Sequence, residues 1–281
     1  MVEPAALPQT VGDALAVARG RIPPGEARMF LREILACTAA RIAAYPEQPL
    51  TPGQASRFGD WLIRREAGEP MAYLLGQREF YGRRFQVSPA VLIPRPETEL
   101  IVDLVKARCR LAAPRILDLG TGSGALAVTL ALEIPGARVS AVDVSPAALD
   151  LARSNGVSLD AQVSFIESDW LAALPAGQFF DFIVSNPPYI AAGDPHLALG
   201  DVRFEPPGAL ASGPAGLDDL CHIAMAAPDF LVPGGWLLME HGYDQGPAVR
   251  SLLAERGFER VETVRDLAGL ERVGVGQWRC N

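Results

Sequence analysis

Two prolines flanked by an amide and a phenol directly follow an apolar run. The segment FDFIVS is succeeded by Asn186, Pro187, Pro188 and Tyr189. The Asn186 side chain and the rigid carbonyl groups beside it can accept hydrogen bonds, and an aromatic ring can cover a flat group. These residue types could hold a planar polar group such as an amide or an exocyclic amine. The alternative is a stiff turn, because Asn-Pro and Pro-Pro are common breakers of strands.

A glycine-rich loop further upstream is the second candidate site. Gly120, Thr121, Gly122, Ser123 and Gly124 stand between an apolar run and a helical pattern. Positions without a side chain let the backbone turn tightly and approach a ligand, and the following helix offers free N–H groups. These features favour a nucleoside-type cofactor. The loop also fits the dinucleotide fingerprint G-x-G-x-x-G/A, and simple strand–helix packing is the remaining alternative.

Acidic residues and an indole stand where consecutive strands are expected to end. Asp143 follows the loop by about 20 residues, the distance at which a carboxylate meets ribose hydroxyls in such folds. Asp118 would repel a pyrophosphate but attract an ammonium or sulfonium group, unless it only fixes amides of the loop. Asp169 can accept from an adenine amino group and Trp170 can cover the ring, unless the two residues merely begin a helix.

The elements expected around these residues alternate between strand and helix. Apolar runs predict strands at 115–119, 137–144, 162–168, 180–185 and 234–240, with helical patterns at 94–110, 123–134, 145–156 and 244–257. Nearly uninterrupted apolar strands are typical of a parallel sheet covered on both faces. The pattern predicts a doubly wound α/β fold that ends in an antiparallel hairpin at 258–267 and 271–278.

The N-terminal part has a different pattern and shows no candidate for chemistry. Apolar residues recur at helical spacing over 11–22, 25–45 and 51–70, and Thr51 followed by Pro52 predicts a helix start. Aromatic and β-branched residues over 71–93 predict a hairpin or short strands. We therefore expect a helical substrate-recognition domain over 1–73, a β-hairpin or linker over 74–93 and a catalytic domain over 94–281.

Composition restricts the class of protein. Hydrophobic residues make up 49% and charged residues 21% of 281, as in ordinary globular proteins. The formal net charge of −8 makes nucleic acid an unlikely partner, although Arg78, Arg83 and Arg84 could form a local basic strip. None of the cysteines and histidines has metal-ligand spacing, so no metal site is predicted.

Cysteine usage and hydropathy suggest where the protein works. The scattered residues Cys37, Cys109, Cys221 and Cys280 fit a reducing compartment. The N-terminal stretch lacks the basic start and apolar centre of a signal peptide, and no apolar run approaches the ~20 residues that span a bilayer. We expect no membrane association and a cytoplasmic location. The oligomeric state does not follow from the sequence.

Taken in order, DLGTGSG, the acid of AVDVS, SDW and NPPY resemble the Rossmann-like class I methyltransferases that use S-adenosylmethionine. Enzymes with NPPY methylate a planar nitrogen: adenine N6, cytosine N4 or a glutamine amide. More narrowly, MAYLLGQREFYG, LIPRPETEL, EPPGAL and MEHGYDQG are similar to stretches of the HemK/PrmC family of protein-(glutamine-N5) methyltransferases. The resemblance implies S-adenosyl-L-methionine as cofactor and the Gly-Gly-Gln glutamine of class I peptide chain release factors as target.

Residue roles follow for each part of the site. Cofactor contacts are expected from the loop residues Gly120, Thr121, Gly122, Ser123 and Gly124 and from Asp118, Asp143, Asp169, Trp170 and Asn186. Catalysis is expected from Asn186, Pro187 and Tyr189, with Pro188 beside them in the substrate site. The resemblance adds Arg95 and Glu97 at the substrate mouth, where a domain joint with a helix start is the alternative. His241 is expected in the core or at the rim rather than as a base.

The expected chemistry explains why the NPPY segment would act as a clamp, that is, hold a planar amide between hydrogen-bond acceptors and an aromatic ring. An amide nitrogen is a poor nucleophile because its lone pair is delocalised. Asn186 Oδ1 and Pro187 O can each accept one of its N–H groups, and both bonds strengthen as positive charge grows on nitrogen in the transition state. Tyr189 can lie against the flat face of the group. No general base is assigned, because the methylated cation is acidic enough to lose its proton afterwards.

Other functions remain open at this stage. The same clamp would serve an adenine-N6 or cytosine-N4 nucleic-acid methyltransferase, and a ribosomal-protein glutamine methyltransferase is separated only weakly. A nicotinamide-dependent dehydrogenase would share the glycine loop, but it leaves NPPY and SDW unexplained. A non-catalytic binding protein would have no need of Asn186.

Overall fold

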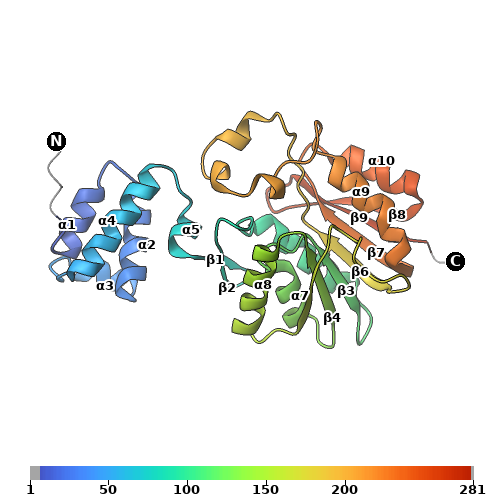
Figure 1. Cartoon of the computed structure of the whole chain (residues 1–281), viewed down its shortest axis with the longest axis horizontal. Helices are drawn as coiled ribbons and strands as arrows, with labels where there is room; N and C mark the ends of the chain where they lie inside the picture. The colour runs from blue at the N-terminus through green and yellow to red at the C-terminus, as the bar shows by residue number, and fades with distance from the viewer. Residues whose placement is uncertain (1–6, 280–281) are drawn as a thin grey trace. The chain divides into compact units, whose positions relative to one another are not determined.

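A computed structural model describes residues 7–279, which form two compact units that divide between Gly76 and Gln77 (Figure 1). Of the four cysteines, Cys280 lies outside the described residues. None of the helices within the described range is long and apolar enough to cross a membrane.

The first unit is built from helices around an aromatic centre. Phe30 packs edge-on against Phe58 and at a tilt against Trp61. The expected helix start at Thr51 is confirmed, because Thr51 and Gln54 form a reciprocal capping box. The helices are α1 (Val11–Ala18), α2 (Pro24–Leu35), α3 (Ala39–Ala44), α4 (Pro52–Glu66) and α5 (Met71–Leu75).

Two helical details differ from the sequence-based expectation. The pattern over 25–45 is not one helix, because Ala36 adopts a left-handed conformation with φ +46° and separates α2 from α3. Strands were expected from residue 71, but Met71–Leu75 is helical. Its apolar residues Met71, Leu74 and Leu75 recur at helical spacing against the core of the first unit, and Gly76 ends the helix with φ +71°.

The second unit begins with the expected hairpin and continues as a twisted sheet. Strands β1 (Gln77–Phe80) and β2 (Arg83–Gln86) pair antiparallel. Within the described residues, seven further strands form one sheet in the order β5-β4-β3-β6-β7-β9-β8. They are β3 (Arg115–Leu119), β4 (Arg138–Asp143), β5 (Val163–Glu167), β6 (Phe180–Ser185), β7 (Leu231–Glu240), β8 (Phe258–Arg265) and β9 (Glu271–Trp278).

Of the strands described in this sheet, only β9 runs against the others, which confirms the predicted fold class. Strands β3 to β7 pair parallel, while β9 runs antiparallel to both β7 and β8. Helices cover both faces: α6 (Glu99–Arg108), α7 (Ala125–Glu133), α8 (Pro146–Ser158), α9 (Asp218–Ala226) and α10 (Gly246–Arg256). Short 3-10 helices occupy Pro96–Thr98, Pro195–Ala198, Val202–Phe204, Pro207–Ala209 and Ala227–Phe230. The sequence pattern had not indicated α9.

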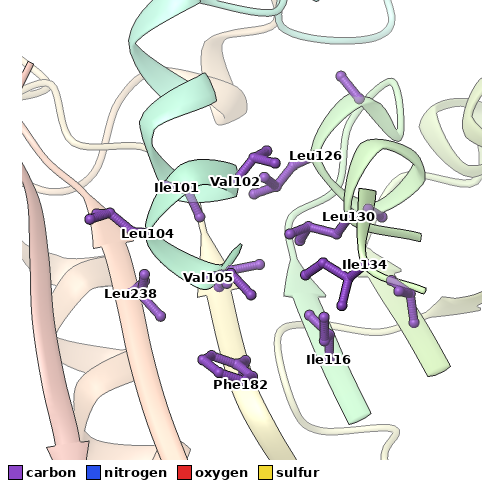
Figure 2. Packing of buried hydrophobic residues seen from close by; sticks show 14 of the residues in the cluster. Ile101, Val102, Leu104, Val105, Ile116, Leu126, Leu130, Ile134, Phe182 and Leu238 are labelled. Carbon is purple, nitrogen blue, oxygen red and sulfur yellow. The ribbon is translucent and has the colours of Figure 1, made fainter. Parts of the chain in front are cut away.

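Alternation along the strands decides which helix each side chain meets. Ile116, Phe182 and Leu238 belong to the cluster with α6 and α7, whereas their neighbours Leu117, Ile183 and Leu237 belong to the cluster with α9 and α10. Figure 2 shows the first cluster, with Val102 of α6 pointing toward Leu126 of α7 and Val105 lying above Phe182 of β6. Each face of the sheet therefore has its own apolar layer.

The same alternation carries two acids into the interior. Asp118 is two residues beyond Ile116, and Glu240 is two residues beyond Leu238, so both point to the face covered by α6 and α7. Asp118 is 1% exposed and Glu240 is 0% exposed. Asp118 lies near the carboxyl end of β3 and Glu240 at that of β7, the two strands on either side of β6, and the strand order reverses between β3 and β6. Such a point is where ligands bind in open α/β sheets.

Candidate functional site

A cavity of about 420 Å³ opens at this edge of the sheet. Its size is typical of small-molecule sites, which span about 300–1,000 Å³. Most of the residues singled out from the sequence line it: Arg95, Asp118, Gly120, Thr121, Gly122, Ser123, Asp143, Asp169, Trp170, Asn186 and Pro188. Glu97, Gly124, Pro187 and Tyr189 are not among its lining residues.

The glycines of the loop have different neighbours. A Cβ on Gly120 would lie 3.3 Å from the Trp170 ring, so this position must stay small for the indole to cover the loop. A Cβ on Gly124 would lie 3.0 Å from the Ala152 Cβ atom of α8. Both residues also have positive φ, +69° and +79°. Gly120 therefore shapes the cavity, while Gly124 serves the packing of α7 against α8.

Asp143 joins the loop to the neighbouring strand ends. Its Oδ2 atom accepts from the Gly122 amide at 2.8 Å, and its Oδ1 atom accepts from the Ser145 amide at 2.9 Å. Its own carbonyl oxygen accepts from the Ser168 amide at 3.0 Å. Asp169 and Trp170 follow directly and line the same cavity. We call Asp118, residues 120–124, Asp143, Asp169 and Trp170 the cofactor half of the site.

Asp118 is a buried carboxylate that accepts from a neighbouring hydroxyl. The Thr121 hydroxyl donates to its Oδ2 atom at 2.7 Å. Burial raises the pKa of Asp118 to about 7, with a further rise from the nearby Asp143 carboxylate, although the Thr121 hydrogen bond opposes the shift. A cationic group in the cavity would favour the ionised form. The cavity therefore combines a carboxylate suited to a cation with an indole and two further acids suited to a nucleoside.

The segment 186–189 is fixed at both ends. On the upstream side, the Ser185 hydroxyl donates to the Leu119 carbonyl oxygen at 2.8 Å. On the downstream side, the Ile190 amide donates to Leu210 O and its carbonyl accepts from the Ser212 amide, both at 2.9 Å. These bonds close residues 191–209 into a loop whose two ends lie side by side. The Gln245 side chain also donates to the Tyr189 carbonyl oxygen at 3.0 Å.

Side chains from distant segments orient Asn186 and Tyr189. Asn186 Nδ2 donates to Thr98 Oγ1 at 3.1 Å, and the Thr98 hydroxyl donates to Glu240 Oε2 at 2.6 Å. The Tyr189 hydroxyl donates to the other oxygen of Glu240 at 3.1 Å. Asn186 Oδ1 is buried and has no hydrogen-bond partner among residues 7–279. We call Thr98, Asn186, Pro187, Tyr189 and Glu240 the acceptor half.

Thr98, Glu240 and Glu205 had no role in the sequence-based site. Arg95 donates to Glu205 Oε1 at 2.5 Å, and the other carboxylate oxygen of Glu205 accepts from the Ile93 amide at 2.9 Å. The Glu205 side chain is fully buried. Glu240 could have been found from the sequence, because it is an acid in the last position of an apolar strand. Thr98 and Glu205 belong to the segments LIPRPETEL and EPPGAL. These segments indicated a similarity to the HemK/PrmC family but gave no role to either residue.

The remaining candidates lie elsewhere. His241 is fully buried and is not among the residues that line the cavity, and burial lowers its pKa. In the part of the chain that the structure describes, no group of three or more His, Cys, Asp or Glu side chains is placed to hold a metal ion.

Comparisons with known proteins support a single family. Residues 9–76 match a family model described as the PrmC N-terminal domain, and residues 96–204 match the methyltransferase small domain. The release factor glutamine methyltransferase of Bordetella pertussis is 50% identical over 91% of this chain and 95% of its own. That of Neisseria gonorrhoeae is 50% identical over 92% and 94%. A crystal structure of a methyltransferase from Pyrococcus furiosus shares the fold, with a TM-score of 0.54 at 17% identity, over 82% of this chain and 100% of that one.

Proposed function

Because the chain belongs to the family of release factor glutamine methyltransferases and uses S-adenosylmethionine, we propose that it methylates the glutamine of the Gly-Gly-Gln motif in class I peptide chain release factors. The cofactor supplies a methyl group on a sulfonium sulfur. The protein is a protein-glutamine N5-methyltransferase. Its residues bind the cofactor, orient the substrate amide and stabilise the transition state.

The observation that carries the proposal is the free oxygen of Asn186. Its Oδ1 atom is buried and has no hydrogen-bond partner among residues 7–279, while its Nδ2 atom is already bonded to Thr98. A buried unpaired acceptor is unfavourable unless a ligand pairs it. An amide N–H of a glutamine side chain is a donor of the right chemistry, and Asn186 lines the cavity that would hold the methyl donor.

The acceptor half can then activate the amide by positioning. The Asn186 side-chain oxygen and the Pro187 carbonyl oxygen accept the two N–H groups of the substrate amide. The prolines restrict backbone motion, and Ser185 and Ile190 fix the ends of the segment. Both accepting bonds strengthen as positive charge develops on the nitrogen, so they lower the barrier rather than merely bind. The Tyr189 ring lies against the flat face of the amide.

The cofactor half would hold the methyl donor by its three chemical parts. We assign Asp143 to the ribose hydroxyls, Asp169 and Trp170 to the adenine ring, and Asp118 to the cationic end, because all four line the cavity. The Gly120–Gly124 loop brings its backbone close to the ligand. Arg95 lines the cavity mouth and Glu97 lies nearby on the same segment, which supports a role for both in receiving the substrate.

The segments of the chain divide this work. We assign residues 1–73 to recognition of the release factor, 74–93 to a connecting hairpin and 94–281 to catalysis. The reaction belongs in the cytoplasm, where release factors act on ribosomes.

A labelling experiment tests the proposal. Purified enzyme, S-adenosylmethionine with a labelled methyl group and a class I release factor should give one labelled methyl group per release factor. The matched control is the same release factor with the motif glutamine replaced by alanine, which should stay unlabelled. Equal labelling of the control, or label in RNA, DNA or a ribosomal protein instead, contradicts the proposal.

A further inference from the structure

The hydrogen-bond chain behind Asn186 has a fixed direction. A hydroxyl has one proton, and the Thr98 hydroxyl donates it to the buried carboxylate of Glu240 at 2.6 Å. The Thr98 oxygen can therefore meet Asn186 only as an acceptor, and it does so with Nδ2 at 3.1 Å. An Asn186 amide turned by half a rotation would set two acceptors against each other. The amide consequently keeps Oδ1 away from Thr98.

Burial and spacing show that this chain is built into the fold. Glu240 is 0% exposed and Thr98 is 6% exposed. They are 142 residues apart in sequence, and Asn186 is 88 residues from Thr98. Strand alternation sends Glu240 to the face where α6 starts, and Thr98 ends the 3-10 turn that leads into α6. Glu240 also accepts from the Tyr189 hydroxyl at 3.1 Å, so one carboxylate is bonded directly to Tyr189 and is linked to Asn186 through Thr98.

We propose that Thr98 and Glu240 are positioning residues for the methyl transfer, which lock the Asn186 amide with its oxygen toward the substrate and strengthen that oxygen as an acceptor. The inference rests on the proposed function of Asn186. Hydrogen bonds in a chain polarise one another, so electron density pushed from Glu240 through Thr98 to Nδ2 makes Oδ1 more negative. A more negative oxygen stabilises the cationic nitrogen of the transition state more than the neutral amide of the ground state.

The hydrogen-bond chain from Glu240 through Thr98 to Asn186 also explains how the site distinguishes an amide from a carboxylate. A locked acceptor favours a glutamine, which donates two N–H groups, over a glutamate, which donates none when ionised. A freely rotating asparagine could instead present its NH2 group to a carboxylate. Fixing the amide therefore serves specificity as well as rate.

Replacement of Thr98 by valine tests the lock. Valine keeps the shape but can neither accept from Asn186 nor donate to Glu240, so we expect kcat to fall about 10- to 100-fold, the scale of one lost charge-assisted bond. The Kd for S-adenosylmethionine, measured by calorimetry, should change less than about threefold because Thr98 does not hold the loop. Thr98→Ser restores the hydroxyl and should recover most of kcat.

Thr129 provides a matched control. It is a fully buried threonine of α7 whose hydroxyl has no hydrogen-bond partner among the described residues. Thr129→Val makes the same chemical change outside the site, and kcat should stay within about twofold of the wild-type value. Wild-type kcat in Thr98→Val, or equal losses in the valine and serine variants, overturns the proposal.

A substrate-free measurement separates this proposal from the proposed function. The side-chain NH2 signals of Asn186 in the 15N NMR spectrum, assigned by their loss in Asn186→Ala, should shift in Thr98→Val and remain in Thr98→Ser. Unmoved signals in Thr98→Val overturn the lock even if turnover falls. Glu240→Gln removes the charge and leaves one acceptor oxygen for the two hydroxyls of Thr98 and Tyr189, and we expect about a 3- to 10-fold loss of kcat; an unchanged kcat contradicts the electronic role. If the wild-type enzyme transfers no methyl group to a release factor, the proposed function is wrong, whatever the NMR spectrum shows.

Discussion

The two halves of the site are held together in different ways. In the cofactor half, carboxylates bond to residues close in sequence: Asp118 to Thr121, and Asp143 to Gly122 and Ser145, at separations of 3, 21 and 2 residues. In the acceptor half, the bonds join residues 51, 88 and 142 positions apart. The cofactor half can form once the adjacent strands β3, β4 and β5 have paired. The acceptor half is complete only when β6, β7 and the start of α6 are all in place.

This difference should appear in kinetics as two separable kinds of loss. Damage in the acceptor half should lower turnover with little effect on cofactor affinity. Damage in the cofactor half should weaken cofactor affinity with less effect on turnover at saturation. Four measurements examine this separation.

The largest effect is expected from Asn186→Ala. The variant removes the oxygen that we propose to stabilise the developing cation, and kcat should fall about 100- to 1,000-fold, as for loss of an oxyanion-hole donor. Single-turnover kinetics with saturating cofactor measures the loss. A Kd for S-adenosylmethionine that rises as much as kcat falls would show that the two halves are not separable.

Asp143→Ala is the reciprocal change. It removes the acceptor for the Gly122 and Ser145 amides, so the loop loses its support. We expect the Kd for S-adenosylmethionine to rise about 10- to 100-fold, the effect of one or two charge-assisted bonds. The value of kcat at saturating cofactor should fall by much less. Calorimetry and steady-state kinetics on the same preparation give both numbers.

The pKa of Asp118 predicts how cofactor affinity depends on pH. With a pKa of about 7, Asp118 is ionised above that pH and protonated below it. A cationic ligand binds the ionised form, so affinity should fall as the pH drops through 7, by up to about tenfold per pH unit. Asp118→Asn should flatten this dependence. Titrations between pH 6 and 8 would contradict the prediction if wild type and variant had the same slope.

The smallest effect concerns stability. Burial raises the pKa of Glu240 to about 7 from the ordinary 4.5. Between these values the folded protein binds the proton more tightly than the unfolded chain, so the free energy of unfolding decreases as the pH rises through this window. Glu240→Gln removes that loss and should raise Tm at pH 8 by about 2–6 °C while it lowers kcat. At pH 4 the difference in Tm should vanish; a lower Tm at pH 8 would indicate a structural role instead.

The same contrast explains how much of the site could be predicted from the sequence. The loop, Asp118, Asp143 and the NPPY segment follow strands that have clear apolar patterns, so their meeting at one edge of the sheet was predictable. Thr98 ends a short 3-10 helix and Glu205 lies between two others, and nothing local in the sequence shows that they bond to Asn186 and Arg95. The left-handed conformation of Ala36 and the short helix α9 were not predicted for a related reason, because tertiary packing overrides weak local preference.

The bonds around Ile190 have a consequence for diversification. Leu210 and Ser212 close residues 191–209 at their base, and Glu205 within them is anchored by Ile93 and Arg95. None of residues 191–204 is buried, so this stretch forms a surface excursion whose length is uncoupled from the geometry of NPPY. Doubling a flexible excursion adds only about 0.6 kcal/mol of closure entropy. Insertions or grafted peptides at its tip should leave the catalytic clamp undisturbed, which makes this segment a natural place for lineages, or protein engineers, to alter which macromolecule is received.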